Sequence, residues 1–315
     1  LARRFGIGRL DYLLWRAPIG AVRGSHAAGG PFQQLAAIRG RTEMANDDVN
    51  LPTTCADPQA NVPMLHFLTG NSFWFQTAFC LHSLQRQAGT SFRAAFHDDG
   101  SLTPAQRERL QTLFPHATVL DRADHDDFIE QHLPRTKFPF LHDRRRRYPN
   151  IRKLTDVHAG RTGWQLVLDS DMLFFRRPEF VLRWLSAPDR PLHLVDVTDS
   201  YGYSRTLMES LAGAPIPPRV NVGLTGLNSD NLDWAQLEFW CRQLIETEGT
   251  NYYLEQALVA MLVAGKDAAI APAPDYVIAP SRLECLQPTA VLHHYVAASK
   301  RWYFRETWRL LASPS

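Results

Sequence analysis

Two aspartates, Asp169 and Asp171, stand one residue apart directly after the apolar run LVL (166–168). If the run is a strand, alternation places both carboxylates on one face and Ser170 on the other. Hard divalent ions such as Mg²⁺ or Mn²⁺ take carboxylate oxygens and often complete their shell with substrate phosphates. The pair therefore favours a metal site, with a phosphate-handling nucleophile and a solvated acidic turn as alternatives.

The residues after the pair weigh against the nucleophile. Haloacid-dehalogenase-type phosphatases also end an apolar strand in D-x-D, where the first Asp attacks phosphorus. In this chain Met172, Leu173 and Phe174 follow the pair, and at least three expected strands precede it. Both features differ from the phosphatase pattern, so the metal site remains the favoured interpretation.

Composition bounds the functional class. The chain has 315 residues, of which 45% are apolar, which is enough for one large α/β domain or two unequal ones. Its 34 Lys and Arg against 32 Asp and Glu argue against a general nucleic-acid binder. The cysteines are far apart and show no metal-ligand spacing, which predicts reduced thiols and a cytoplasmic protein. They are Cys55, Cys80, Cys241 and Cys285.

The first 62 residues read as an N-terminal helical or irregular extension of a main domain at 63–315. The segment LARRFGIGRLDYLLWRAPIG (1–20) is basic, and its apolar run is too short for a signal peptide. It predicts a helix packed on the domain, with a membrane-surface helix as the alternative. Residues 40–62 are polar and turn-rich and predict a connection. The charge-free stretch 58–85 has too many polar residues for a membrane span.

Strand and helix signals alternate after this extension. This alternation predicts an α/β fold, with a mostly parallel central sheet and helices on both faces. Ligands of such sheets bind outside the carboxyl ends of the strands. The run DRRRRYPNIRK (143–153) reads as a solvated basic loop. The expected strands are 64–70, 91–99, 117–121, 164–171, 192–197 and 220–228, and the expected helices are 73–89, 103–115, 150–160, 178–188, 232–249 and 252–265.

Near the C-terminus, HHYVAASKRW places His294, Lys300 and Trp302 at the spacing H-x5-K-x-W. This resembles the closing motif of glycogenin-type retaining glycosyltransferases, a GT-A family that includes bacterial lipooligosaccharide galactosyltransferases. The resemblance implies that His294 joins Asp169 and Asp171 as a ligand of Mn²⁺ (or Mg²⁺), and that Lys300 contacts the donor diphosphate. The neighbouring His293 is the alternative ligand.

This chain departs from the family pattern at two positions of the motif. Ala297 stands where the family usually has Gly, and Arg301 where it has Pro. A Gly at position 297 would allow the backbone to approach a phosphate closely, and Ala makes such an approach less favourable.

Further stretches match the family in order over about residues 63–305. FLTGNSFW resembles the loop that holds the nucleotide base, which implies base contacts from Thr69 and Asn71 and stacking of Trp74 on uracil. Core packing is an equal alternative for Trp74. IRKL resembles a helix that carries a basic donor contact, and Lys153, sixteen residues before Asp169, is the match.

Two more stretches imply contacts with the donor sugar. NVG resembles an N-x-G at the end of a central strand and implies a role for Asn221, although a strand-end cap is an equal alternative. LEQAL resembles D-Q-x-x-L, with Glu255 in place of Asp and Gln256 matched. An acid at a helix start is also favourable with the helix dipole. Asp196 ends an expected strand, and we predict that it also contacts the donor sugar.

Together these features predict a metal-dependent glycosyltransferase (a hexosyltransferase), retaining if the family's stereochemistry applies. The implied donor is a nucleotide-diphosphate sugar, linked to UDP, and the acceptor is a glycan, lipid or protein that no motif identifies. We expect no nucleic-acid partner. We expect a cytoplasmic protein, with peripheral association with a membrane as the alternative. The alternatives are a non-catalytic nucleotide-sugar or glycan-binding relative, and a phosphatase or nucleotidyltransferase built on D-x-D.

Overall fold

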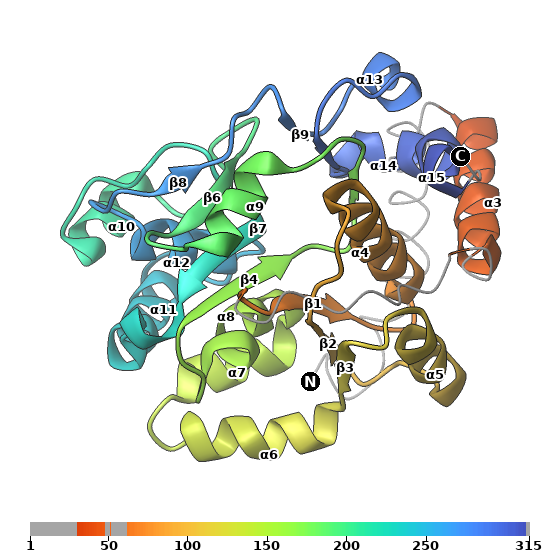
Figure 1. Ribbon diagram of the computed structural model, residues 1–315. Coiled ribbons are helices and arrows are strands. Elements are labelled where there is room, and N and C mark those ends of the chain that lie inside the picture. The colour runs from red at the N-terminus through yellow and green to blue at the C-terminus, as the bar shows by residue number, and fades with distance from the viewer. Residues whose placement is uncertain (1–29, 48–50, 52–61, 313–315) are drawn as a thin grey trace, which may run out of the picture. The chain divides into compact units, whose positions relative to one another are not determined.

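The computed structural model describes residues 30–47, 51 and 62–312 (Figure 1). The chain forms two compact units: unit 1 comprises residues 1–50, 279–288 and 295–315, and unit 2 comprises residues 51–278 and 289–294. The basic segment 1–20 and Cys55 lie outside the described residues. Cys80, Cys241 and Cys285 are buried free thiols. None of the helices in the described ranges has the length and hydropathy needed to cross a membrane.

Unit 2 is built on a seven-stranded sheet in the order β3-β2-β1-β4-β7-β6-β8. Neighbouring strands are parallel except where β7 pairs with β4 and β6. This confirms the α/β fold with a mostly parallel sheet. The strands are β1 (Leu65–Thr69), β2 (Ala94–Asp98), β3 (Ala117–Leu120), β4 (Trp164–Leu168), β6 (Leu192–Val195), β7 (Val220–Asn228) and β8 (Ala269–Ile270). A second, three-stranded sheet has the order β5 (Met172–Phe174), β10 (Leu292–His294), β9 (Tyr276–Ile278).

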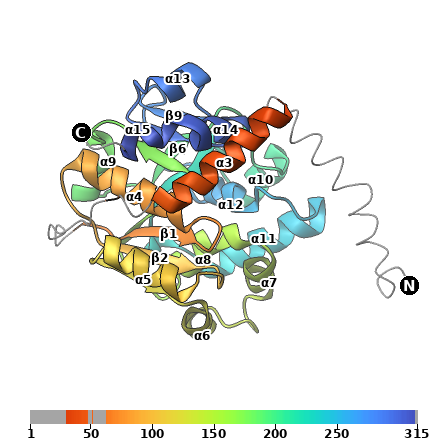
Figure 2. The same ribbon diagram turned by 90° about the vertical axis from the view of Figure 1, so that its right-hand side faces the viewer.

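Helices cover both faces of the large sheet, and Figures 1 and 2 show α4 and α8 on opposite sides of β1. A large core cluster lies among the helices that follow β3 and β7. The helices of unit 2 are α4 (Trp74–Ala88), α5 (Pro104–Leu113), α6 (Arg122–His132), α7 (Pro139–Arg147), α8 (Arg152–His158), α9 (Glu179–Ser186), α10 (Arg205–Ala212), α11 (Trp234–Glu248) and α12 (Leu254–Leu262). Short 3-10 turns are η3 (Pro149–Ile151) and η4 (Ser229–Asn231).

The arginine-rich run is not a solvated loop, which corrects the sequence interpretation. Its first half lies in α7, and Arg144, Arg145 and Arg152 are buried. The Nε of Arg145 donates to Asp156 Oδ1 at 2.6 Å and its Nη2 to Asp156 Oδ2 at 2.8 Å. A two-point contact of this kind satisfies a buried guanidinium, so Arg145 holds α7 to α8 rather than facing water.

Buried histidines link the sheet to α8. His66 on β1 lies with its Nδ1 2.9 Å from His97 Nε2 and its Nε2 2.9 Å from Gln165 Oε1. On α8, the Nδ1 of His158 lies 2.9 Å from Ser229 Oγ. Burial lowers the pKa of His66 and of His158 to about 3, and that of His97 well below its usual value. These imidazoles are therefore neutral in the folded protein.

We expect the free energy of unfolding to fall as the pH drops below about 6.5, the ordinary pKa of histidine. Below that pH the unfolded chain binds protons that the folded protein cannot accept, so each buried histidine removes up to about 1.4 kcal/mol per pH unit. Urea unfolding between pH 7.5 and 5 measures this slope. His158→Asn, which keeps a donor for Ser229, should make the slope shallower, because it removes one of the histidines whose pKa burial lowers. An unchanged slope in this variant would contradict the assignment.

Unit 1 consists of helices in its described part. They are α3 (Pro31–Asp47), α13 (Arg282–Leu286), the 3-10 turn η5 (Ala297–Ser299), α14 (Lys300–Trp302), the π-helical turn η6 (Tyr303–Thr307) and α15 (Arg309–Ala312). The expectation of a turn-rich connection over 40–62 is wrong for residues 40–47, which belong to α3. The division at residue 62 itself stays a prediction.

Ala297 takes the left-handed backbone conformation, with φ of 47°. This conformation costs an L-residue other than Gly about 1–2 kcal/mol. The backbone therefore keeps the shape that a Gly would favour, although the side chain has changed. We expect Ala297→Gly to raise the free energy of unfolding by about 1 kcal/mol, measured by denaturant titration. The matched control Ala298→Gly should lower it by about 0.5–1 kcal/mol, and equal effects of the two would contradict the expectation.

Candidate functional site

The two aspartates lie in the short link between β4 and β5. β4 ends at Leu168, so the expected strand 164–171 is three residues shorter than predicted. The backbone N–H of Asp169 still donates to Gly223 O at 2.7 Å and extends the pairing with β7. Ser170 points the other way, with its Oγ 2.7 Å from Thr77 Oγ1. The carboxylates of Asp169 and Asp171 therefore share one side, as the sequence predicts.

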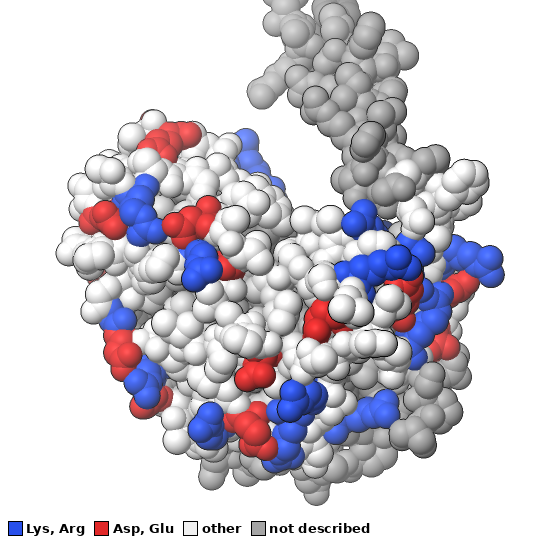
Figure 3. Space-filling model, turned by 90° about the horizontal axis from the view of Figure 1, so that it is seen from above, with Lys and Arg blue, Asp and Glu red and all other residues white. Residues whose placement is uncertain are grey.

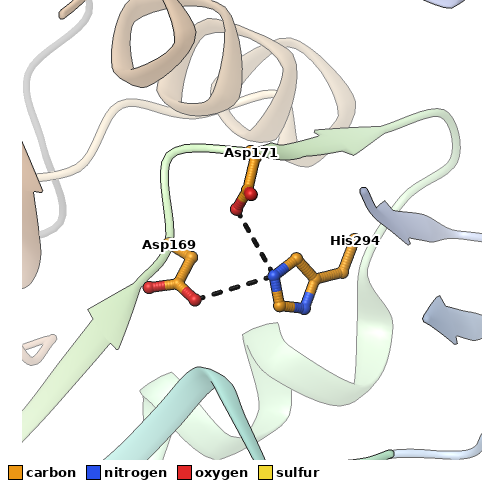
Figure 4. A group of neighbouring side chains, drawn as sticks. All are labelled: Asp169, Asp171 and His294. Atoms are coloured by element: carbon orange, nitrogen blue, oxygen red, sulfur yellow. Dashed lines mark ion pairs between the residues drawn. The ribbon is translucent and has the colours of Figure 1, made fainter. Parts of the chain in front are cut away.

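His294 reaches the aspartates through the second sheet. β10 pairs antiparallel with β5, and this pairing sets His294 opposite Met172, next to Asp171. Figure 4 shows the imidazole directed at both carboxylates, with Nε2 3.3 Å from Asp171 Oδ1 and 3.6 Å from Asp169 Oδ2. His293 lies elsewhere, with its ring centroid 4.8 Å from that of Phe175. The geometry thus joins His294, and not His293, to the pair.

Gly223 on β7 makes room for this imidazole. A Cβ at this position would lie 2.3 Å from His294 Cε1 and 2.5 Å from His294 Nδ1. The backbone N–H of Gly223 donates to Asn221 Oδ1 at 3.0 Å. The NVG stretch therefore supplies the surface on which the histidine rests.

The three side chains fit a divalent cation. One ligand atom from each of Asp169, Asp171 and His294 lies within 4.8 Å of the other two. Ligand atoms of an octahedral ion bound at about 2.1 Å lie about 3 Å apart, close to the two distances from Nε2. The Nδ1 of His294 is buried and has no hydrogen-bond partner among the described residues. The side chains of Asp169 and Asp171 keep 26% and 16% of their surface exposed, so phosphate or water can complete a shell.

Lys153 joins the aspartate pair to Glu255. Its Nζ lies 2.7 Å from Asp169 Oδ1 and 3.2 Å from Glu255 Oε2, and all but 8% of the lysine side chain is buried. Burial alone lowers the pKa of Lys153, but the two carboxylates outweigh it and the pKa is raised. Burial raises the pKa of Glu255 to about 7 against the opposing effect of Lys153. The lysine thus remains a cation beside the candidate metal site.

A second network contains Asp196, Asn221 and Gln256. Asp196 Oδ2 accepts from Asn221 Nδ2 at 3.1 Å and from Gln256 Nε2 at 3.2 Å. Asn221 is near the start of β7, which runs antiparallel to β4 and β6, so it lies at the edge where those strands end. The topology therefore brings this network and the aspartate pair to the same edge of the sheet, which is where ligands of α/β sheets bind.

The residues predicted to hold the base lie after β1. Thr69 is buried, and its Oγ1 accepts from Thr77 Oγ1 at 2.9 Å. Asn71 is exposed, and its Oδ1 accepts from Gln106 Nε2 at 2.8 Å. Trp74 is buried at the start of α4, with its ring perpendicular to Phe75. Their contacts with a base stay predictions. Lys300 belongs to unit 1, where it begins α14.

Sequence reasoning missed the residues that orient the site. Thr77 and Ser170 link α4 to the loop of the aspartates, and Gly223 was noted only as part of NVG. Hydroxyls and glycines of this kind carry no signal until the strands are placed. One missed helix, α6, did have a signal, because Asp121 caps it by accepting from Ala123 N at 2.8 Å.

Comparisons with known proteins give similarity of structure only. No protein-family model and no curated protein matches the chain by sequence. The structure resembles that of the galactosyltransferase LgtC in complex with donor and acceptor sugar analogs, with a TM-score of 0.52 and 15% identity over 80% of this chain and 97% of that one.

It also resembles the apo structure of the bifunctional glycosyltransferase WbbM, with a TM-score of 0.50 and 10% identity over 83% of this chain. This chain spans only about half of WbbM, 53% of its length. Identities this low establish the fold and not the reaction. The chain has the GT-A fold of these glycosyltransferases, as the resemblance in its sequence predicts.

Proposed function

We propose that this protein is a metal-dependent glycosyltransferase that uses a nucleotide-diphosphate sugar, with UDP as the nucleotide. The observation that carries the proposal is the convergence of Asp169, Asp171 and His294 at the ligand-binding edge of a GT-A sheet.

Each residue of the site has a role in this proposal. Asp169, Asp171 and His294 would hold Mn²⁺ or Mg²⁺, and the ion would supply positive charge to neutralise the departing diphosphate. Lys300 adds a second cation for the diphosphate. Thr69, Asn71 and Trp74 bind the base, following the sequence resemblance.

Polar side chains next to the metal site bind the donor sugar. Lys153 holds Asp169 and Glu255 in place through its two ion pairs. Asp196 orients the amides of Asn221 and Gln256, because one carboxylate oxygen accepts from both. These groups offer donors and acceptors for sugar hydroxyls.

We further propose that the anomeric configuration is retained. The site network contains no side chain that is an evident covalent nucleophile, because Glu255 is paired with Lys153 and Asp196 with two amides. Retention itself follows from the sequence resemblance, and without an evident nucleophile the preferred route to it is attack by the acceptor on the face that the diphosphate leaves. The anomer of the product, determined by NMR, tests this part independently of the donor.

A thermal-shift screen of UDP, GDP and CMP derivatives, with and without Mn²⁺, tests the nucleotide and the metal together. We expect UDP to raise the melting temperature only with Mn²⁺, because the proposed site holds the diphosphate through the metal. A ligand at one hundred times its Kd stabilises the folded state by about 2.7 kcal/mol, which sets the expected size of the shift. The same screen with EDTA gives the metal-free reference. No shift with any nucleotide would contradict the proposal, and a shift with GDP alone would correct the nucleotide.

A non-catalytic nucleotide-sugar-binding relative is the alternative. The departures from the family pattern at Ala297 and Arg301 raised this option, but Ala297 keeps the left-handed backbone that Gly favours. The backbone at that position therefore gives no support for lost activity. Binding of UDP without transfer or donor hydrolysis across a panel of sugars would identify the alternative.

A further inference from the structure

The charges of the chain are divided unequally between its two units. By sequence, unit 1 contains twelve Lys and Arg against six Asp and Glu, while unit 2 contains twenty-two against twenty-six. The near-neutral total therefore combines a basic unit with an acidic one. In Figure 3, Lys and Arg side chains gather over the helices of unit 1. A basic unit attracts anionic partners at long range, and it does so most strongly at low salt.

The helix α3 of this unit presents an apolar row to solvent. Phe32, Leu35 and Ile38 are 85%, 65% and 56% exposed. Their spacing of three residues keeps them on one side of the helix. The side chain of Arg39 is 83% exposed and adjoins the row in the helix. This row is an exposed apolar surface with a cation beside it.

The opposite side of α3 is packed against the rest of unit 1. Met44 is fully buried, and a Cβ at Gly40 would lie 1.9 Å from the carbonyl oxygen of Phe304. Glu43 accepts from Arg309. Figure 2 shows α3 lying across α14 and α15. These contacts fix which face of α3 is outward in the described part of unit 1.

Three guanidinium groups surround Trp302 near the start of α3. The Cζ atoms of Arg282, Arg301 and Arg305 lie 5.1, 4.4 and 5.2 Å from the centroid of the Trp302 ring. Arg305 also donates to Gln33 on α3, the residue next to Phe32. The cationic cluster and the apolar row are therefore neighbours within unit 1.

Unit 1 also carries other exposed apolar side chains. Among the described residues, six of the twelve exposed large hydrophobic side chains belong to it, although it makes up about a quarter of the chain. Beyond the α3 row they are Leu283, Leu286 and Leu310. Apolar residues mixed with arginines and a tryptophan match the boundary of a bilayer, where acyl chains lie beneath charged headgroups.

We propose that unit 1 docks on the surface of an anionic lipid bilayer. The row Phe32, Leu35 and Ile38 enters the headgroup layer, and the exposed Arg282, with the half-buried Arg301, binds lipid phosphates. Nucleic acid is disfavoured as the partner because it offers no apolar layer for the row. A second copy of unit 1 is disfavoured because it would bring like charges together. This inference does not depend on the proposed sugar transfer.

Co-sedimentation of the full chain with vesicles tests the proposal without nucleotide or metal. We expect binding to vesicles with equal parts of phosphatidylcholine and phosphatidylglycerol, and at least tenfold weaker binding to phosphatidylcholine alone. The triple variant Phe32→Ser, Leu35→Ser, Ile38→Ser should bind at least tenfold more weakly. Arg282→Gln with Arg301→Gln should also bind more weakly and should lose most of the dependence on salt.

Matched substitutions in unit 2 serve as controls. The double variant Phe239→Ser, Ile270→Ser removes exposed apolar side chains from unit 2. The double variant Arg146→Gln, Arg242→Gln removes exposed charges from it. Both double variants should bind vesicles as the original protein does. Circular dichroism and thermal unfolding confirm that each variant folds.

Three results would overturn the proposal. They are no binding to anionic vesicles, equal binding to both kinds of vesicle, and binding that the unit 1 variants leave unchanged. A dimer that the triple variant abolishes, without vesicle binding, would instead assign the face to a second copy.

Discussion

An Asp171→Ala variant is expected to lose most Mn²⁺-dependent turnover of the donor, with kcat/KM about 10²–10³-fold lower. The substitution removes the carboxylate whose Oδ1 lies 3.3 Å from His294 Nε2, so one of three converging ligands disappears. Calorimetry of Mn²⁺ binding and assays of donor hydrolysis measure the two parts of the effect. The ion pairs of Lys153 run to Asp169 and Glu255, which the variant keeps, so the Lys153 network should remain folded.

The control for this variant is Asp189→Ala. Asp189 is 70% exposed and pairs with Arg190, which lies beside the start of β6 at the far edge of the sheet. Its loss should leave both Mn²⁺ binding and turnover within twofold. Full activity of Asp171→Ala would remove the basis of the assignment. Lost activity with unchanged Mn²⁺ affinity would show that Asp171 acts on the donor rather than on a metal.

The order of strands and helices in unit 2 was largely predictable because each element has its own local signal. The helix α5, for example, begins with Thr103 as its cap and Pro at its first position, and the structure shows the full capping box. The predicted strands at 64–70, 91–99 and 117–121 correspond to β1, β2 and β3. The reversed direction of β7 carries no such signal, because a buried strand reads the same in either direction.

The arginine run shows why a charge pattern misled the sequence analysis. Arg145 lies in a stretch of four arginines, which usually indicates a solvated segment. Its partner Asp156 lies eleven residues further along, on another helix. Only the packing of α7 against α8 reveals that the charge is buried and satisfied. Long-range pairing of this kind cannot be read from spacing.

The candidate site could be predicted where a motif encodes it and not where the fold assembles it. The spacing that links His294 to Lys300 pointed to His294 before its neighbours were known. The three-stranded sheet then sets His294 beside Asp171 through its register with Met172. The carboxylate of Asp196 was only a strand-end residue in the sequence. Its bonds to Asn221 and Gln256 appear once β6 and β7 are paired.

A Gly223→Ala variant is expected to weaken Mn²⁺ binding by about 10–100-fold, as changes behind a metal ligand commonly do. The added methyl group would lie 2.3 Å from His294 Cε1, so the imidazole must leave its position facing the aspartates. The strand cannot shift away easily, because the carbonyl of Gly223 accepts from Asp169 N at 2.7 Å. Overpacking of this kind also lowers the free energy of unfolding by about 1–3 kcal/mol.

Gly226→Ala separates the effect on the metal site from the effect on stability. Gly226 lies on the same strand, three residues further on and therefore on its opposite face. A Cβ there would lie 2.4 Å from Trp184 Cζ2. The clash is similar in size to that at Gly223, but it does not involve His294. Calorimetry should show nearly unchanged Mn²⁺ affinity for Gly226→Ala and a comparable loss of stability. If both variants bound Mn²⁺ equally well, His294 would have no part in holding the metal, and the site would reduce to its two carboxylates.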